Sequence, residues 1–160
     1  MPVKIEGSEN IRDIFCILHD GSLISHATDG GELGLEVEIR YLAERIDPSF
    51  RKFEVRLFGV SDVQFSTWPG DLTSEAETLT DVGEIFRADL EVLEGNIKED
   101  FIEVVCNQRS PEFAYCGGEL RFRCSYAVVT DEAGRAYSIE ELDSLCKGYW
   151  DDWSRRARGA

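Results

Sequence analysis

Apolar and polar residues alternate along most of the first 130 positions, with the period of two that is expected of β-strands. The clearest case is the segment 33–41, in which every second residue from Leu33 to Tyr41 is apolar. One side of this strand is therefore buried and the other is wet, which favours an antiparallel sheet covered on one face. Similar patterns predict strands at 11–18, 23–29, 53–57 and 63–68, so the first 68 residues are expected to form a meander of about five strands.

Residues 67–83 interrupt this pattern. They lose the apolar period and are rich in Pro, Gly, Ser, Thr and acidic residues, which predicts a long surface connection. Ser74 and Glu77 are spaced so that they can cap a single helical turn within it. A connection of this length inside one domain is typical of a functional or mobile loop.

Three more strands are predicted after this connection. Residues 84–93 and 97–107 form a hairpin around Glu94-Gly95-Asn96, because Gly and Asn suit a tight turn, although a helix is the alternative for 84–93. Residues 119–129 alternate again and form the last long strand. The turn at 131–134 then leads into the C-terminal segment.

The C-terminal segment is predicted to be an amphipathic helix. Ser138 and Glu141 form a capping box, and the apolar residues that follow lie on one stripe of a helix with 3.6 residues per turn. We expect Trp150 or Trp153 to contact the face formed by residues 33–41. The predicted fold is thus α+β, a mostly antiparallel sheet of about eight strands with this helix packed on one face.

Composition is consistent with one domain over residues 1–160. A chain of 160 residues with 42% hydrophobic content can bury a sufficient core without a metal ion or a disulfide. The five cysteines are odd in number, show no CxxC spacing and are interpreted as reduced core residues. We find no targeting sequence and no apolar run that could span a bilayer, and we expect a bacterial, cytoplasmic protein.

The formal net charge of −15 argues against nucleic acid and anionic membranes as partners. Residues 71–103 contain eleven Asp or Glu residues against only Arg87 and Lys98, so a charged partner is expected to be a basic protein that meets this region. An acidic surface that only maintains solubility is the alternative. The partner-binding candidates in this region are Asp71, Glu75, Glu77, Asp81, Glu84, Asp89 and Glu91.

Catalytic signals are few. The chain lacks a Gly-rich phosphate loop and the HExxH and GxSxG motifs, and it has two histidines, His19 and His26. His19 and Asp20 are the weak catalytic candidates, as a base oriented by a carboxylate, with Ser22 or Cys16 as a nucleophile. A His-Asp-Gly sequence also arises from turn preference alone. We predict no metal site and no cofactor, and the analysis of motifs leans against an enzyme.

The segment Leu18-His19-Asp20-Gly21, with the strand patterns up to Trp68, resembles small bacterial proteins of unassigned function that begin with an LHDG or LHDA motif. Some of these resemble immunity proteins, which neutralise toxins delivered between bacteria. The resemblance implies a cytosolic, β-rich binding protein. Three hypotheses follow: an acidic protein that binds a basic partner, a small-ligand module that uses the uncovered sheet face, and an enzyme with a base at His19 and Asp20. The oligomeric state is left open.

Overall fold

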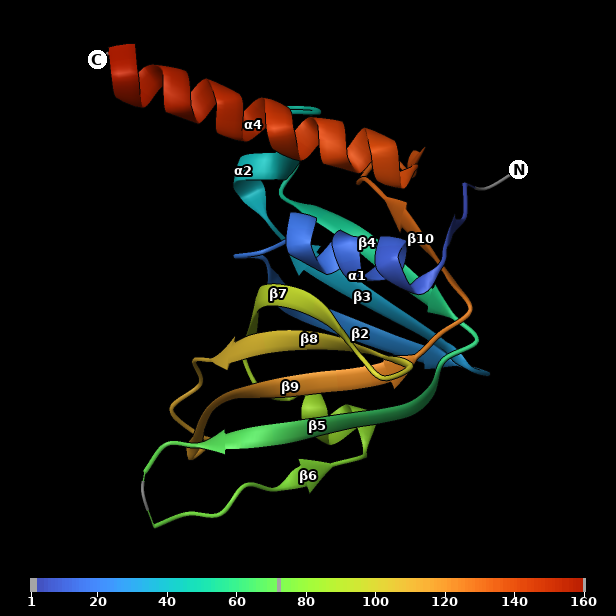
Figure 1. Cartoon of the computed structure of the whole chain (residues 1–160), viewed down its shortest axis with the longest axis vertical. Coiled ribbons are helices and arrows are strands. Elements are labelled where there is room, and N and C mark those ends of the chain that lie inside the picture. Colours follow the sequence, from blue (N-terminus) through green and yellow to red (C-terminus); the bar gives the residue numbers. More distant parts are fainter. Residues whose placement is uncertain (1–2, 72, 160) are drawn as a thin grey trace.

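The computed structural model describes residues 3–71 and 73–159 and has an α+β fold (Figure 1). In this part of the chain, eleven strands form one antiparallel sheet and the C-terminal helix is packed against it. The elements are β1 (Ile5–Glu6), α1 (Ser8–Ile17), β2 (Ser22–Asp29), β3 (Glu32–Glu38), α2 (Arg40–Ala43), β4 (Lys52–Phe58), β5 (Ser61–Pro69), β6 (Thr78–Leu79), α3 (Val82–Ile85), β7 (Leu90–Lys98), β8 (Phe101–Gln108), β9 (Tyr115–Arg123), β10 (Tyr126–Thr130), β11 (Ala136–Tyr137) and α4 (Ile139–Gly159).

The sheet has two halves. The strand order is β1-β10-β4-β3-β2-β7-β8-β9-β5-β6, with β11 paired to β10, and every pairing is antiparallel as predicted. The halves join where β2 pairs with β7 over two residue pairs, Ser22 with Glu91 and Leu23 with Leu90. Eight of the eleven strands are longer than two residues, which agrees in number with the eight or so expected from the sequence, although not every expected segment forms one of them.

The predicted strand at 11–18 is wrong, because this segment forms α1. Ile11, Ile14, Phe15 and Leu18 are all buried, and their spacing of three and four residues places them on one side of a helix. This side packs on β7 and β8. The Phe15 ring meets the Phe122 ring edge to face, with the centroids 6.1 Å apart. Helix α1 therefore covers part of the sheet that the prediction left open.

The alternation in 33–41 is confirmed only as far as β3. Leu33 and Val37 are buried, but β3 ends at Glu38 and the chain turns into α2. Leu42 and Ala43 are both buried there, which an extended chain would not allow for adjacent residues with one covered face. Tyr41 consequently lies on a helix, and its predicted place on the strand face is wrong.

The predicted five-strand meander is correct for β2, β3 and β4 but not for β5. Strand β5 pairs with β9 and β6 in the other half of the sheet. The chain turns at Gly59, whose φ of 65° favours glycine and where a Cβ would lie 2.3 Å from Ser125 Oγ. The predicted strand 119–129 bends at the same place and is divided into β9 and β10, so its prediction as one strand is also wrong.

The connection at 67–83 is more ordered than predicted. Strand β5 continues to Pro69, and β6 and α3 lie within the predicted loop. Ser74 and Glu77 do not cap a helical turn, since the Glu77 N–H donates to Thr67 Oγ1 at 2.9 Å. The segment instead runs along the β5–β6 edge of the sheet (Figure 1).

The predicted hairpin at residues 94–96 is displaced. Gly95 and Asn96 lie inside β7, which begins at Leu90, and the turn to β8 comes at Glu99, whose φ is 59°. Glycine is needed at position 95 for a different reason, because a Cβ there would lie 2.5 Å from the carbonyl oxygen of Arg12 on α1. The expectation of a strand throughout 84–93 is wrong for its first half, which includes the end of α3.

Helix α4 begins as predicted. The Ser138 N–H donates to Glu141 Oε1 at 3.0 Å and the Glu141 N–H donates to Ser138 Oγ at 3.1 Å. The helix reaches the rest of the fold through α1, α2 and β11, and Leu142 is its buried residue. None of the helices in residues 3–71 and 73–159 is long and apolar enough to cross a membrane.

Candidate functional site

Six of the seven predicted partner-binding carboxylates lie on the segment that follows β5. They are fully or largely exposed and continue from the end of β5, through β6 and α3, to the start of β7. Because β6 is the last strand of the sheet, this segment forms one border of the molecule. We call these residues the acidic edge: Asp71, Glu75, Glu77, Asp81, Glu84 and Asp89.

Local hydrogen bonds hold two carboxylates of the acidic edge in place. Asp71 Oδ1 accepts from the backbone N–H and the hydroxyl of Thr73 and from the N–H of Ser74, each at 2.8 Å, and these bonds lower the pKa of Asp71 to about 2. Asp81 caps α3 by accepting from the N–H of Gly83 at 2.8 Å. Both side chains are therefore held by backbone hydrogen bonds.

Glu91 does not belong with these six residues. It is 9% exposed, and its carboxylate lies 2.5 Å from the Arg109 guanidinium. Glu103, on the same face of the sheet, is likewise neutralised, since it pairs with Arg121 at 2.8 Å. The sequence alone does not separate Glu91 from the acidic edge, because its partner Arg109 comes directly after β8 and is distant along the chain.

His19 and Asp20 follow α1, and their side chains are adjacent. His19 Nε2 lies 3.8 Å from Asp20 Oδ2, while Nδ1 lies 2.8 Å from the carbonyl oxygen of Cys16 and therefore carries a proton. The Cys16 thiol donates to the carbonyl oxygen of Gly95, on β7. One of the two nucleophiles considered from the sequence, Cys16, is thus bonded to the β7 backbone, and neither His19 nor Asp20 lines the hollows described below.

His26 lies on β2, and its ring stacks on Phe86 with the centroids 5.3 Å apart. The two histidines thus have different aromatic partners. Within residues 3–71 and 73–159, no three His, Cys, Asp or Glu side chains are grouped so that they could hold a metal ion.

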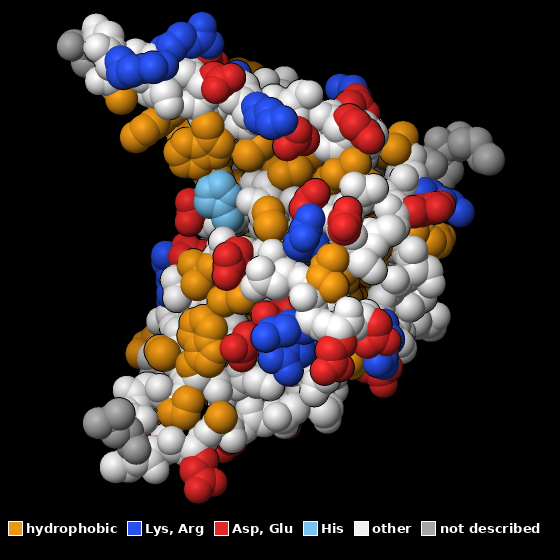
Figure 2. Space-filling view, in the orientation of Figure 1, with side chains coloured by type: hydrophobic (Ala, Val, Ile, Leu, Met, Phe, Trp, Pro, Cys, Tyr) orange, Lys and Arg blue, Asp and Glu red, His pale blue; other side chains and the backbone are white. Residues whose placement is uncertain are grey.

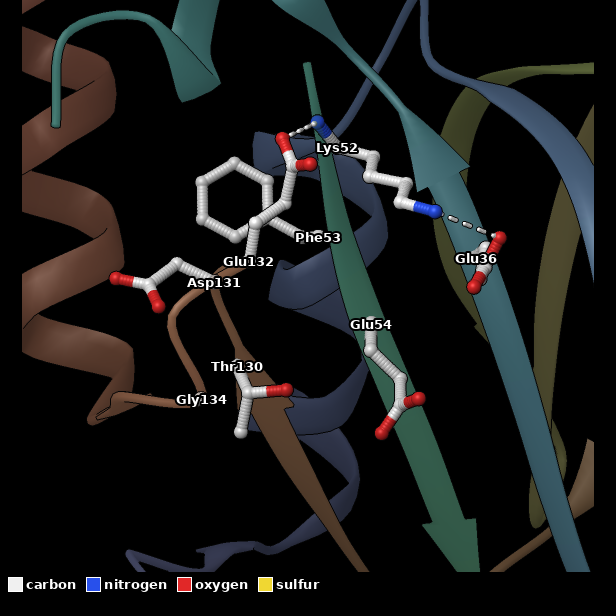
Figure 3. Close-up of a pocket in the computed structure, with 8 residues that line it drawn as sticks. All are labelled: Glu36, Lys52, Phe53, Glu54, Thr130, Asp131, Glu132 and Gly134. Carbon is white, nitrogen blue, oxygen red and sulfur yellow. Dashed lines mark hydrogen bonds and ion pairs between the residues drawn. The ribbon is translucent and has the colours of Figure 1, made fainter. Parts of the chain in front are cut away.

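Hollows of more than one kind lie in the surface. One, of about 460 Å³ and lined mainly by charged residues, lies beside β4 and the turn after β10 (Figure 3). In Figure 3 the Lys52 side chain extends to Glu36, at 3.1 Å, and Phe53 lies behind the charged groups. Its lining residues are Glu36, Lys52, Phe53, Glu54, Thr130, Asp131, Glu132 and Gly134. Such walls suit a polar or cationic group rather than an apolar small molecule.

An aromatic cluster that sequence analysis did not predict joins α4 to α1 and α2. The His19 ring stacks on Trp150 at 5.6 Å, and Tyr41 lies 4.5 Å from Tyr149 between centroids. Trp150 reaches Tyr41 at 6.0 Å, so the expected contact exists, although with α2 rather than the sheet. Burial raises the pKa of the Tyr41 hydroxyl, and the nearby Asp20 carboxylate raises it further. Figure 2 shows hydrophobic side chains gathered beneath the C-terminal half of α4.

The cysteines are free, as predicted, but not all are core residues. Cys106 is fully buried, and burial raises the pKa of its thiol to about 12, whereas Cys16 and Cys116 are exposed.

No known family, curated protein or solved structure matches this chain.

Proposed function

We propose that this protein binds a basic protein partner through the acidic edge. The observation that supports the proposal is how these carboxylates differ from others in ion pairing. Among the described residues, none of the six forms an ion pair, whereas Glu91 on β7, Glu103 on β8 and Asp100 in the turn between these strands each have an arginine partner. The border of the sheet is thus left negative, while these three carboxylates are neutralised.

The charge of this segment is large for its length. Residues 71–89 contain six carboxylates and one cation, Arg87. The guanidinium of Arg87 lies 6.0 Å from the centroid of the Phe113 ring. At physiological ionic strength the screening length is about 8 Å, so neighbouring carboxylates act together on an approaching cation. Complementary potentials of this kind increase association rates and suppress wrong partners.

The resemblance of residues 1–68 to toxin-immunity proteins suggests a specific form of the proposal. In that form the partner is a basic toxin, and binding blocks its active surface. A chain with net charge −15 is suited to such a partner, since the attraction is of long range and needs no deep cavity. The two hollows with charged linings, beside β4 and beside β7, are consistent with protein binding and do not favour a small apolar ligand.

The test compares three forms of the immobilised chain in capture from a bacterial lysate at low and high salt. One is unchanged. The second has the acidic edge neutralised by Asp→Asn and Glu→Gln substitutions, which retain the Asp71 turn and the Asp81 cap. The control neutralises six exposed acids elsewhere: Glu6, Glu9, Glu38, Glu44, Glu140 and Asp151.

The proposal expects basic proteins that are retained by the unchanged chain and the control, lost from the acidic-edge variant, and released by salt. Equal capture by all three forms would contradict it. Loss from the two variants alike would show that only total charge matters, which also contradicts a specific edge.

A further inference from the structure

The outer face of the second half of the sheet carries a broad hollow with a tryptophan at its border. The hollow has a volume of about 920 Å³ and lies between α1 and the outer face of β7, β8 and β9. Trp68, Glu94, Val105 and Glu119 line it from the strands. Helix α1 packs on the opposite face of β7 and β8, and its residues Arg12, Asp13 and Cys16 line the hollow from that side.

Strand register fixes how these side chains lie. Glu94, Val105 and Glu119 are paired in one row across β7, β8 and β9. The row continues to Ser66 on β5, and Trp68 is two residues further along the same strand and on the same face. Trp68 is therefore a diagonal neighbour of Glu119.

The Trp68 indole lies against the sheet because its cross-strand partner is a glycine. A Cβ on Gly117 would lie 2.7 Å from Trp68 Cε3, so any side chain there would displace the ring. Trp68 is half-buried and lines the hollow, so part of its indole is open to it. The fold thus presents a half-exposed aromatic surface beside carboxylates.

The lining of the hollow has a net negative charge, because it contains four carboxylates, Asp13, Glu94, Glu103 and Glu119, and two cations, Arg12 and Lys98. Glu103 is neutralised by Arg121, and Asp13 by Arg12 at 2.9 Å. Glu94 and Glu119 form no ion pair within the described part of the chain, and an Asn96 amide 3.5 Å from Glu94 is a weak contact. Two free carboxylates and an indole face together favour a planar cation, because guanidinium stacks on aromatic rings and donates to carboxylates in a fork.

We propose that this hollow receives an arginine side chain of the basic partner, stacked on Trp68 and bound by Glu119 and Glu94. The inference rests on the proposed function and names the side chain that anchors the partner. The hollow adjoins the acidic edge, since Asp71 is three residues beyond Trp68 and Glu77 is bound to Thr67 through the Thr67 hydroxyl at 2.9 Å. One basic surface can therefore reach both, with the arginine as a central contact of the kind that dominates protein interfaces.

The test follows the three indole N–H signals of the native chain by NMR while arginine amide is added. Trp68→Phe identifies the Trp68 signal. We expect this signal to move with an affinity in the millimolar range, and the signals of Trp150 and Trp153 to stay fixed as a measure of intact folding. Lysine amide is expected to bind about threefold more weakly, and norleucine amide to produce no shift.

Substitution distinguishes this site from the acidic edge. Glu94→Gln with Glu119→Gln is expected to weaken arginine amide binding about tenfold, while the matched pair Glu9→Gln with Glu140→Gln leaves it unchanged. The six-residue acidic-edge variant is expected to respond like the unchanged chain. A fixed Trp68 signal, an equal response to norleucine amide, or a response lost only in the acidic-edge variant would overturn the site without deciding the capture experiment.

Discussion

The packing of α1 on β7 makes Gly95→Ala a decisive substitution. The new Cβ would lie 2.5 Å from the Arg12 carbonyl oxygen and 3.2 Å from Phe15 Cβ. Ordinary contact begins at about 3.4 Å, so α1 has to move away by about 0.9 Å, and the atom in its way is backbone, which cannot rotate aside. Overpacking of this kind costs about 1–3 kcal/mol. For a chain of this size, each kcal/mol lowers the melting temperature by about 2–4 °C.

The matched control is Gly34→Ala in β3. Its nearest neighbour would be the Ala27 carbonyl oxygen at 3.8 Å, an ordinary contact, so this substitution is expected to change stability by no more than about 0.5 kcal/mol. Urea unfolding followed by far-UV circular dichroism measures both variants. We expect a lower midpoint with an unchanged slope for Gly95→Ala. Equal midpoints for the two variants would refute the placement of α1 on β7.

Three further predictions concern single side chains. Tyr137→Phe removes the O–H donor to Asp131 Oδ2, now at 2.7 Å in a buried site, and is expected to cost about 2 kcal/mol in urea unfolding; a cost below the error of that measurement would contradict the bond. The Asp71 carboxyl signal should titrate near pH 2 by ¹³C NMR. Because its pKa is lowered by folding, the turn's contribution to folding stability is present above pH about 4 and is lost between about 4 and 2. A midpoint near 4 would show an unconstrained side chain. Cys16 should react with a thiol reagent in the native protein at pH 8 while Cys106 reacts only after unfolding, as read by mass spectrometry of the labelled peptides; early labelling of Cys106 would mean that its strand opens.

Sequence patterns predicted those parts of the fold that depend on local spacing. Strands β3 and β4 alternate because one face of each is buried, and α4 begins where Ser138 and Glu141 satisfy each other's backbone donors. The helix α1 had a local signal as well, in the spacing of Ile11, Ile14, Phe15 and Leu18, but the dense apolar run resembles a buried strand.

The errors arose where distant residues decide local structure. Gly95 suits a turn by composition, yet it lies within β7 because α1 crosses the strand there. Cys124 and Ser125 continue an alternating pattern, but the bend opposite Gly59 divides the strand between two halves of the sheet. At the candidate site, the acidic edge is exposed, as its polar composition indicates. The neutralisation of Glu91 by Arg109 could not be predicted from the sequence, because it depends on the pairing of β7 with β8.

The central claim is that binding is directed by the carboxylates of the acidic edge. Its most direct test is the association rate constant between this chain and a captured basic partner, measured by surface plasmon resonance over a range of salt concentrations. We predict that this rate falls steeply with salt for the unchanged chain and depends much less on salt for the acidic-edge variant. The same rate and the same salt dependence for both chains would contradict the claim.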